Sequence, residues 1–468
     1  MILKKFIVTG LHDLIDADID FHDDINIIVG RNGSGKTSIL SLLSSIVRMD
    51  IETIKSMTFS YCELIVDAGI SGPIKITASN TSEKHFIAIF WPNHEDIEIP
   101  LIDIDLLFRY GTRRATPAML AATLGVGSAG NSAELFRKWS LISTEFLQLA
   151  KLTFVRLDRT IVAMDPDGIE AGENGTQNAR DRSRSSVGKR DPIDEVTRVT
   201  QAKYFEYKRS VELIRAEVYR ELMRLHFSPV KPLGKKGNIT QLKKKLAELK
   251  IRVNSSSLVS DIQELIKEFF ESLENLVKQA EPPSAPKRTG RKTLAEESVQ
   301  LMLELKESQT EELLNIFDSE RKKMFEANKS IRNYLDTLEK FLSESGKRLW
   351  FSEESLQLAF YIESAGEKAQ GVGRNLKDLS SGERQILIVL TYLAFLSGPD
   401  SIFIIDEPEL SLHLRWQGYL IEALQKLRPP GSQILIATHA PEIAGRARRR
   451  SIQLSQKYLP KILGSNNV

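Results

Sequence analysis

The chain is poor in three features that would place it among secreted, membrane or strongly nucleic-acid-binding proteins. Cys62 is the one cysteine in 468 residues, which excludes an internal disulfide and a zinc site made of several cysteines from one chain. The formal net charge is only +2, so any surface that attracts nucleic acid must be local. No stretch approaches about 18 uninterrupted apolar residues, so we expect no transmembrane helix and no membrane partner.

What is present is the composition of a globular protein with a sizeable core. Hydrophobic residues make up 41% of the chain and charged residues 27%. The length suggests roughly two to four structural units. Residues 1–6 are too short and too soon followed by polar residues to form a signal peptide, and the lone cysteine fits a reducing compartment. We therefore expect a cytoplasmic protein.

The chain is organised around residues 30–37, which fit the pattern G-x-x-x-x-G-K-[ST] at every position and which we call the phosphate loop. Apolar residues 25–29 predict a short buried strand before it, and residues 38–47 predict a helix after it. Such a loop aims backbone N–H groups and a helix N-terminus at one point, which favours a phosphate. The candidate nucleotide-binding residues are Gly30, Arg31, Asn32, Gly33, Ser34, Gly35, Lys36, Thr37 and Ser38.

Two side chains of the phosphate loop are suited to the chemistry of a nucleotide. Lys36 is expected at the β- and γ-phosphates, where its ammonium group offsets their charge. Thr37 is expected to place its hydroxyl on Mg²⁺. The sequence therefore predicts a site for a nucleotide and its magnesium ion.

The order of helical and strand patterns predicts an α/β fold in three parts. Residues 1–160 and 348–468 combine strands and helices, and β-rich runs between residues 57 and 91 predict an antiparallel subdomain beside the nucleotide-binding sheet. Residues 161–347 predict a helical insertion of moderate length, with flexible loops near 165–194 and 281–293. Its apolar stripes are interrupted too often for a long coiled-coil arm.

A second motif lies far downstream, at residues 379–385, where small residues open a predicted helix. Ser380-Ser381-Gly382-Glu383-Arg384-Gln385 resembles the signature motif of the ABC-type ATPases, and residues of this kind at a helix N-terminus form another anion-binding geometry. In that family the signature closes over the γ-phosphate held by the partner chain's phosphate loop. The resemblance therefore implies an ABC-type core, a head-to-tail dimer that forms with ATP, and Ser380, Ser381, Gly382 and Glu383 as further nucleotide-binding residues.

Two more segments resemble motifs of the same family. Residues 401–406 predict a buried strand that ends in Asp406 and Glu407, like the Walker B strand. The resemblance implies that Asp406 holds Mg²⁺ and that Glu407 orients or deprotonates the attacking water. Residues 433–438 predict another buried strand, and His439 follows it in the position of the family's switch histidine. Glu407 and His439 are thus the expected catalytic residues, Thr37 and Asp406 the expected metal ligands, and ATP and Mg²⁺ the expected cofactors.

The distance between the phosphate loop and the signature resembles the RecF, SMC and OLD-like group rather than a transporter's nucleotide domain. A zinc hook, long SMC arms and a C-terminal Toprim nuclease domain are not recognisable. The domain plan resembles the ATPase components of bacterial anti-phage systems, such as PtuA of Septu or AriA of PARIS. This implies ATP-dependent dimers or larger oligomers that scaffold or regulate a separately encoded HNH- or Toprim-type nuclease.

Two alternative functions and one unplaced residue stay open at this point. A RecF-like DNA-binding repair ATPase is the main alternative, since the basic run at residues 446–450 suits either DNA or the edge of a final strand. Nucleotide also stabilises an assembly without turnover, simply by binding between two chains. The glutamine of the family's Q-loop is not placed, because the first glutamine after the phosphate loop, Gln148, lies far downstream.

Overall fold

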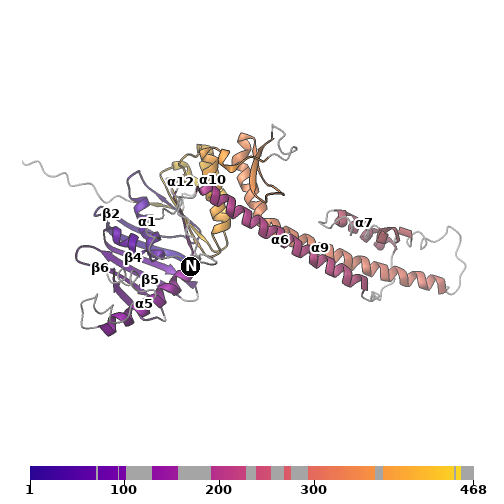
Figure 1. Cartoon of the computed structure of the whole chain (residues 1–468), viewed down its shortest axis with the longest axis horizontal. Coiled ribbons are helices and arrows are strands. Elements are labelled where there is room, and N and C mark those ends of the chain that lie inside the picture. Colours follow the sequence, from indigo (N-terminus) through magenta and orange to yellow (C-terminus); the bar gives the residue numbers. More distant parts are fainter. Residues whose placement is uncertain are drawn as a thin grey trace, which may run out of the picture. The chain divides into compact units, whose positions relative to one another are not determined.

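The computed structural model describes residues 1–69, 72–92, 94–101, 129–156, 191–227, 239–254, 268–272, 274–275, 294–363, 373–446 and 450–454. The predicted α/β fold, with an antiparallel part and a helical insertion, is confirmed (Figure 1). The chain divides into two compact units, residues 1–201 with 333–468, and residues 202–332. The second unit is narrower than the predicted insertion at 161–347. Among the described residues, no helix combines the length and the apolar character that a membrane crossing requires.

The first unit contains a six-stranded antiparallel sheet near its N-terminus. Its order is β2-β1-β4-β5-β6-β7. The strands alternate buried and partly exposed positions, as a sheet with one covered face does. The bounds are β1 Ile2–Leu11, β2 Ile15–Asp20, β4 Phe59–Asp67, β5 Pro73–Asn80, β6 His85–Phe90 and β7 Ile97–Pro100.

A five-stranded parallel sheet forms the other layer of this unit. Its order is β13-β3-β12-β11-β8. Strands β11 and β12 are buried at every position, because helices cover both faces of a parallel sheet and leave no polar side. The bounds are β3 Ile25–Val29, β8 Leu152–Arg156, β11 Ile402–Asp406, β12 Gln433–Thr438 and β13 Ser451–Gln453.

Helix α1 (Lys36–Val47) lies between the two sheets, with β1 on one side and β8, β11 and β12 on the other (Figure 1). Ten of its twelve residues are buried. Its apolar side chains belong to one core that includes residues of both sheets. Burial of this helix on two sides fixes the position of its N-terminus, and therefore of the phosphate loop that precedes it.

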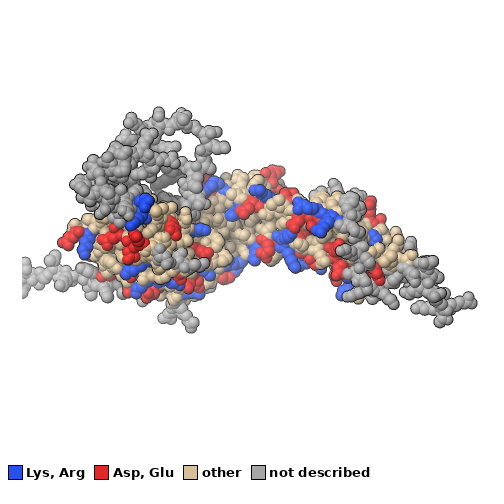
Figure 2. All heavy atoms as spheres, turned by 90° about the horizontal axis from the view of Figure 1, so that it is seen from below, with Lys and Arg blue, Asp and Glu red and all other residues tan. Residues whose placement is uncertain are grey.

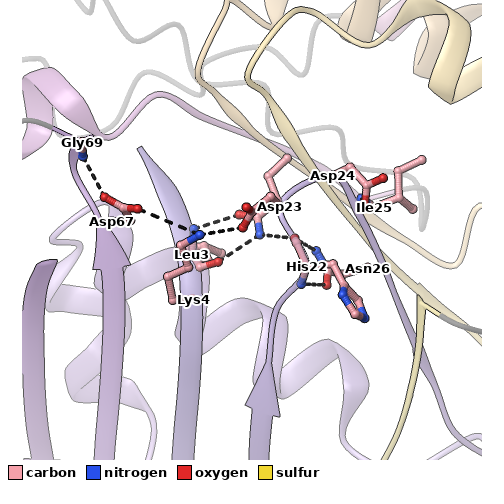
Figure 3. A network of polar contacts seen from close by, with 10 residues as sticks. Leu3, Lys4, His22, Asp23, Asp24, Ile25, Asn26, Asp67 and Gly69 are labelled. Atoms are coloured by element: carbon pink, nitrogen blue, oxygen red, sulfur yellow. Dashed lines mark hydrogen bonds and ion pairs between the residues drawn. The ribbon is translucent and has the colours of Figure 1, made fainter.

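A polar network ties the start of β3 to the antiparallel sheet (Figure 3). Lys4 of β1 contacts Asp23 at 2.7 Å and Asp67 at 3.9 Å. The Asn26 side chain bonds to both backbone groups of His22, at 2.7 and 2.8 Å. These contacts hold the entry of β3 at the edge of the parallel sheet opposite to the phosphate loop.

The later part of the first unit adds a hairpin and three helices. Strands β9 (Lys347–Phe351) and β10 (Leu358–Ile362) form a separate antiparallel pair. Helix α10 (Ser381–Thr391) continues into a π-helical turn, Tyr392–Leu396. Helix α11 (Leu414–Leu427) follows β11, and α12 (Pro441–Arg446) follows β12. Helices α2 (Ile51–Ser56) and α5 (Ala129–Leu149) come earlier in the chain.

The second unit is helical, and two of the helices that form it, α6 (Pro192–Phe227) and α9 (Leu294–Leu342), extend beyond its bounds in the sequence. Helix α6 has 36 residues, α9 has 49, and α7 (Ile239–Asn254) has 16. Helix α9 is unbroken over its 49 residues, because a segment rich in Glu, Lys and Leu stays helical where its apolar stripe is interrupted. The loops predicted near 165–194 and 281–293 lie outside the described residues, except for 191–194 at the start of α6.

Candidate nucleotide site

The phosphate loop connects β3 to α1, as the motif predicts. Gly33 and Gly35 have φ angles of 79° and 88°, which residues with a Cβ rarely adopt. A Cβ on Gly30 would come within 2.4 Å of Ser34 Oγ, and one on Gly35 within 2.3 Å of a methyl group of Ile15. The loop therefore needs glycine for its conformation and for the close approach of its own side chains.

Lys36 is buried and folded back over the phosphate loop. Its Nζ donates hydrogen bonds to the carbonyl oxygens of Gly30, at 2.9 Å, and Arg31, at 3.1 Å. Ser34 Oγ is buried and has no hydrogen-bond partner among the described residues. An ammonium group held by two neutral carbonyls, beside an unsatisfied hydroxyl, suits an anionic ligand that would bond to both. Thr37 is exposed at the first turn of α1.

The parallel sheet brings the expected metal and catalytic residues to the same edge as the phosphate loop. In the register of the sheet, Thr438 at the end of β12 pairs with Val29 at the end of β3. Asp406 at the end of β11 pairs with Ala437 of β12. Because neighbouring strands are about 4.8 Å apart, Asp406 follows the sheet edge about 10 Å from the end of β3. Asp406 carries carboxylate oxygens and Thr37 a hydroxyl oxygen, and oxygen ligands are the kind that Mg²⁺ prefers.

Asp406 and Glu407 are neighbours in sequence but differ in environment. Asp406 is 7% exposed and completes the buried strand. Glu407 has a φ of 51°, unusual for a residue other than glycine, and its side chain is 30% exposed. Its backbone N–H donates to Ala437 O at 2.9 Å, which holds this conformation. The second carboxylate is therefore half-buried, whereas the first is buried.

His439 lies beside two glutamates, of which only Glu407 was an expected site residue. Its Nδ1 is 3.8 Å from Glu407 Oε1 and 2.9 Å from Glu409 Oε1. Glu409 is buried, whereas the His439 side chain is 37% exposed. The hydrogen-bond partners of Glu409 lie about 30 positions further along the chain, so its neighbourhood in the sequence gave no signal of this contact.

The signature segment shows which of its side chains face outward. Ser380 is the N-cap of α10 and, with Glu383, forms a capping box. Ser380 and Ser381 are exposed, but the Glu383 carboxylate is buried and accepts hydrogen bonds from Lys347 at 2.8 and 3.0 Å. Burial alone would raise the pKa of the Glu383 carboxyl, but hydrogen bonds led by that from Lys347 outweigh burial and keep the pKa below its ordinary value. Glu383 thus stabilises the start of α10 through contacts of its buried side chain with Ser380 and Lys347 of the same chain.

Helix α10 contacts the turn that follows β11. Gln385 Nε2 donates to Pro408 O at 3.0 Å. A Cβ on Gly382 would come within 2.6 Å of Ser411 O, so the two backbones nearly touch. Residues 380–385 and 407–412 therefore form one packed region in which neither segment can shift alone.

The glutamine of the Q-loop is not located by these contacts. Gln148 is exposed on α5, ahead of β8, and no described contact brings it to the site. The strand beside β11 is β8, whose Arg156 is in register with Asp406. The residues after Arg156, in which a loop from that edge would begin, lie outside the described part of the chain. The place of the Q-loop stays a prediction.

The two sheets and the phosphate loop define an α/β nucleotide-binding core. The chain belongs to the AAA ATPase domain family, whose model matches residues 1–444. A protein of Methanosarcina acetivorans that carries the name ABC transporter ATP-binding protein is 36% identical to this chain over 85 residues. That alignment covers 18% of this chain and only 30% of the other protein.

Three solved structures resemble the chain along most of its length. The SmcHead bound to the C-winged helix domain of ScpA has 13% identity and a TM-score of 0.35, covering 96% of this chain and 92% of that one. The SMC head domain from Thermotoga maritima has 10% identity and a TM-score of 0.35, with the same coverage of 96% and 92%. The recombination mediator protein RecF of the RecFOR pathway has 10% identity and a TM-score of 0.30, covering 94% and 93%.

Proposed function

We propose that this member of the AAA ATPase domain family binds and hydrolyses ATP at the edge formed by the ends of β3, β11 and β12. The observation that carries the proposal is the gathering of the phosphate loop, Asp406, Glu407 and His439 at that one edge, from segments up to about 400 residues apart. Phosphoryl transfer needs positioning and charge neutralisation more than covalent chemistry, and this edge supplies both.

Each side chain has a distinct part in the proposed reaction. The phosphate loop and Lys36 bind the β- and γ-phosphates, and Thr37 and Asp406 hold Mg²⁺, which when bound neutralises charge on the phosphates. Glu407, half-buried and next to the proposed metal ligand, orients or deprotonates the attacking water. His439 is within reach of the same region and contacts the γ-phosphate.

The proposed working unit is a head-to-tail dimer with ATP between the two chains. The exposed Ser380 and Ser381 at the N-terminus of α10 support this, since they are free to meet a second chain. The contacts of residues 380–385 with 407–412 also support it. A movement of residues 380–385 onto the partner's nucleotide would be passed through these contacts to Glu407.

We further propose that such dimers, alone or in larger oligomers, scaffold or regulate a separately encoded nuclease of the HNH or Toprim type in anti-phage defence. The support is the plan of the chain, an ATPase core interrupted by a helical unit at residues 202–332. The helical unit has a core of its own, so it is suited to bind a partner without disturbing the nucleotide site.

A RecF-like DNA-binding repair ATPase is the alternative function, and the described charges do not favour it. In the basic run at residues 446–450, the side chain that the structure describes is that of Arg450, which forms an ion pair with Asp24. On the face drawn in Figure 2, described Lys and Arg side chains are interspersed with Asp and Glu and do not form one continuous basic surface. Strong binding of DNA requires several unpaired cations along one track.

Glu407→Gln tests the function directly. The variant keeps the shape of the side chain but not its basicity, so we expect ATP binding to persist and turnover to fall by about 100-fold or more. ATP should then hold the chains together, and native mass spectrometry with ATP should show dimers or larger oligomers of Glu407→Gln. Lys36→Ala is the matched control and should show neither binding nor assembly.

The same spectra test the partner when the chain is produced with the protein encoded next to it. A stable complex with an HNH or Toprim nuclease supports the defence role, whereas a lone dimer that binds DNA supports the RecF-like alternative. If Glu407→Gln forms the complex and retains its biological effect, ATP acts as a structural ligand and hydrolysis is not required.

A further inference from the structure

Glu409 is a buried carboxylate, and in the described part of the chain its side chain contacts one short segment, residues 438–440. Its Oε1 accepts hydrogen bonds from Thr438 Oγ1 at 2.7 Å, His439 N at 2.7 Å and Ala440 N at 3.2 Å. The same oxygen lies 2.9 Å from His439 Nδ1. Its second oxygen, Oε2, is buried without a partner among the described residues. One carboxylate oxygen therefore holds both the backbone and the ring of the residue after β12.

The contact with the ring is not required for the stability of this turn. The His439 side chain is 37% exposed, so water would satisfy its Nδ1 if the glutamate did not. The Ala440 N–H and the Thr438 hydroxyl are different, because their bonds to Glu409 are buried and they need an acceptor, and the His439 N–H bond is partly buried. The carboxylate performs a structural task with these donors and a separate orienting task with the imidazole.

The orienting task decides which ring nitrogen is available for a ligand. Nδ1 lies 2.9 Å from Glu409 Oε1, and because a carboxylate accepts but does not donate, a hydrogen bond at this distance requires the proton on Nδ1. Glu407 lies on the same nitrogen's side, at 3.8 Å. No described residue bonds to Nε2, which is therefore the nitrogen free to meet a third group. A histidine fixed in this way by a carboxylate presents one defined nitrogen in one defined direction.

We propose that Glu409 is a positioning residue that fixes His439 with Nδ1 as the donor and Nε2 directed at the γ-phosphate. This inference rests on the proposed function, because it takes ATP as the ligand that Nε2 meets. Glu409 follows Glu407 by two residues, and Pro408 between them is held by Gln385. The turn 407–409 thus places the base and the support of the histidine as one rigid piece.

A double-mutant cycle with Glu409→Gln and His439→Ala tests the proposal. Glutamine keeps the size of the side chain and an acceptor for the buried donors, but loses the charge that binds the ring. We expect kcat to fall by about tenfold or more with KM for ATP unchanged, since the phosphate loop is untouched. In the His439→Ala background, Glu409→Gln should cause no further loss, because there is no ring left to position. Glu442→Gln, an exposed glutamate on α12, is the matched control and should leave kcat unchanged.

Equal losses from Glu409→Gln with and without His439 would overturn the proposal, because they would show a role independent of the ring. An unchanged kcat in Glu409→Gln would do the same. If the proposed function itself were wrong, the result would differ from these two, because the unaltered chain would neither bind nor hydrolyse ATP.

A second measurement needs no change at Glu409 and no ATP turnover. In a long-range ¹⁵N–¹H spectrum of the ¹⁵N-histidine-labelled protein, His439 is assigned by its disappearance in His439→Asn. At a pH where imidazoles are neutral, the proposal requires the proton on Nδ1. A proton on Nε2 would overturn it even if the variant Glu409→Gln failed to fold.

Discussion

At the scale of residues, the turn after β11 gives three neighbouring carboxylates three different environments. Asp406 ends a buried strand, Glu407 is half-buried, and Glu409 is buried again against residues 438–440. The positive φ of Glu407 makes this possible, because it reverses the direction of the chain between the first carboxylate and the third. A local strain of this kind, about 1–3 kcal/mol, persists only where the surroundings enforce it.

Glu383→Gln tests the stabilisation of the start of α10 by its pH dependence. The folded pKa of Glu383 is lowered, so the carboxylate adds stability that is fully present above the unfolded value, about 4.3, and is lost as the pH falls through the folded pKa. We expect Glu383→Gln to lose about 2–4 kcal/mol of unfolding free energy at pH 7, because Lys347 keeps a buried charge without its partner. The difference should shrink below about pH 4. Urea unfolding at several pH values measures it.

The neighbouring hairpin supplies a control for this experiment. Glu363 forms an ion pair with Arg348, but its side chain is 62% exposed. Because exposed pairs contribute only about 0–1 kcal/mol, Glu363→Gln should stay close to the unaltered chain at every pH. A loss in Glu383→Gln that did not change with pH would contradict the prediction, because glutamine keeps the shape of the side chain and the charge would then not be the cause.

Sequence motifs located the residues that directly follow apolar strands. The phosphate loop, Asp406, Glu407 and His439 follow strands whose apolar runs are plain in the sequence, and the structure brings them to one edge. Glu409 was beyond this kind of reasoning, since its bonds span about 30 residues. The inward direction of Glu383 was also missed, because Lys347 is 36 positions away.

At the scale of elements, the continuous apolar strands of the parallel sheet were the easiest to predict. Strand β3 has the predicted bounds, and β11 and β12 lie within the predicted runs. Short elements were missed, namely β7, β9 and the six-residue helix α2, because they have too few residues to show a period. The long helices α6 and α9 continue through breaks in their apolar stripes, since a packed helix tolerates polar interruptions in its stripe.

Gly382→Ala tests the packing of α10 against the turn after β11. The added methyl group would meet the backbone oxygen of Ser411 at 2.6 Å, and a backbone atom cannot rotate away as a side chain can. We expect a loss of about 1–3 kcal/mol of unfolding free energy and a reduced ATPase rate, because the displaced turn carries Glu407. Chemical denaturation and steady-state turnover measure the two effects.

Gly398→Ala is the matched substitution in the same part of the chain. No heavy atom lies within 4 Å of the position of its Cβ, and its φ is not in the left-handed region. This variant should keep the stability and turnover of the unaltered chain. If both alanine variants behaved alike, close contact at Gly382 would not be the cause.

At the scale of the whole molecule, the two units have separate cores, and Cys62 reports on one of them. Cys62 is buried in the core of the first unit, and burial raises the pKa of its thiol, which suppresses reaction further. The second unit has a much smaller core among its described residues. We expect the second unit to unfold at lower urea, seen as a partial loss of helical circular dichroism while Cys62 still resists thiol reagents.

Cys62 labelling that rises together with the first loss of helical signal would contradict this order. Cys62→Ser, followed by circular dichroism alone, is the control that the label itself does not drive unfolding. Because the chain has no other cysteine, the labelling needs no background correction.

The order of strands in the parallel sheet has a consequence for synthesis on the ribosome. Strand β3, which carries the phosphate loop, is made early, but its neighbour β12 comes about 400 residues later. At about 5–20 residues per second, that interval lasts at least about 20 seconds. The nascent chain must therefore wait with an unpaired apolar strand, and a product released early by a stalled ribosome would contain the whole phosphate loop but no ATPase site.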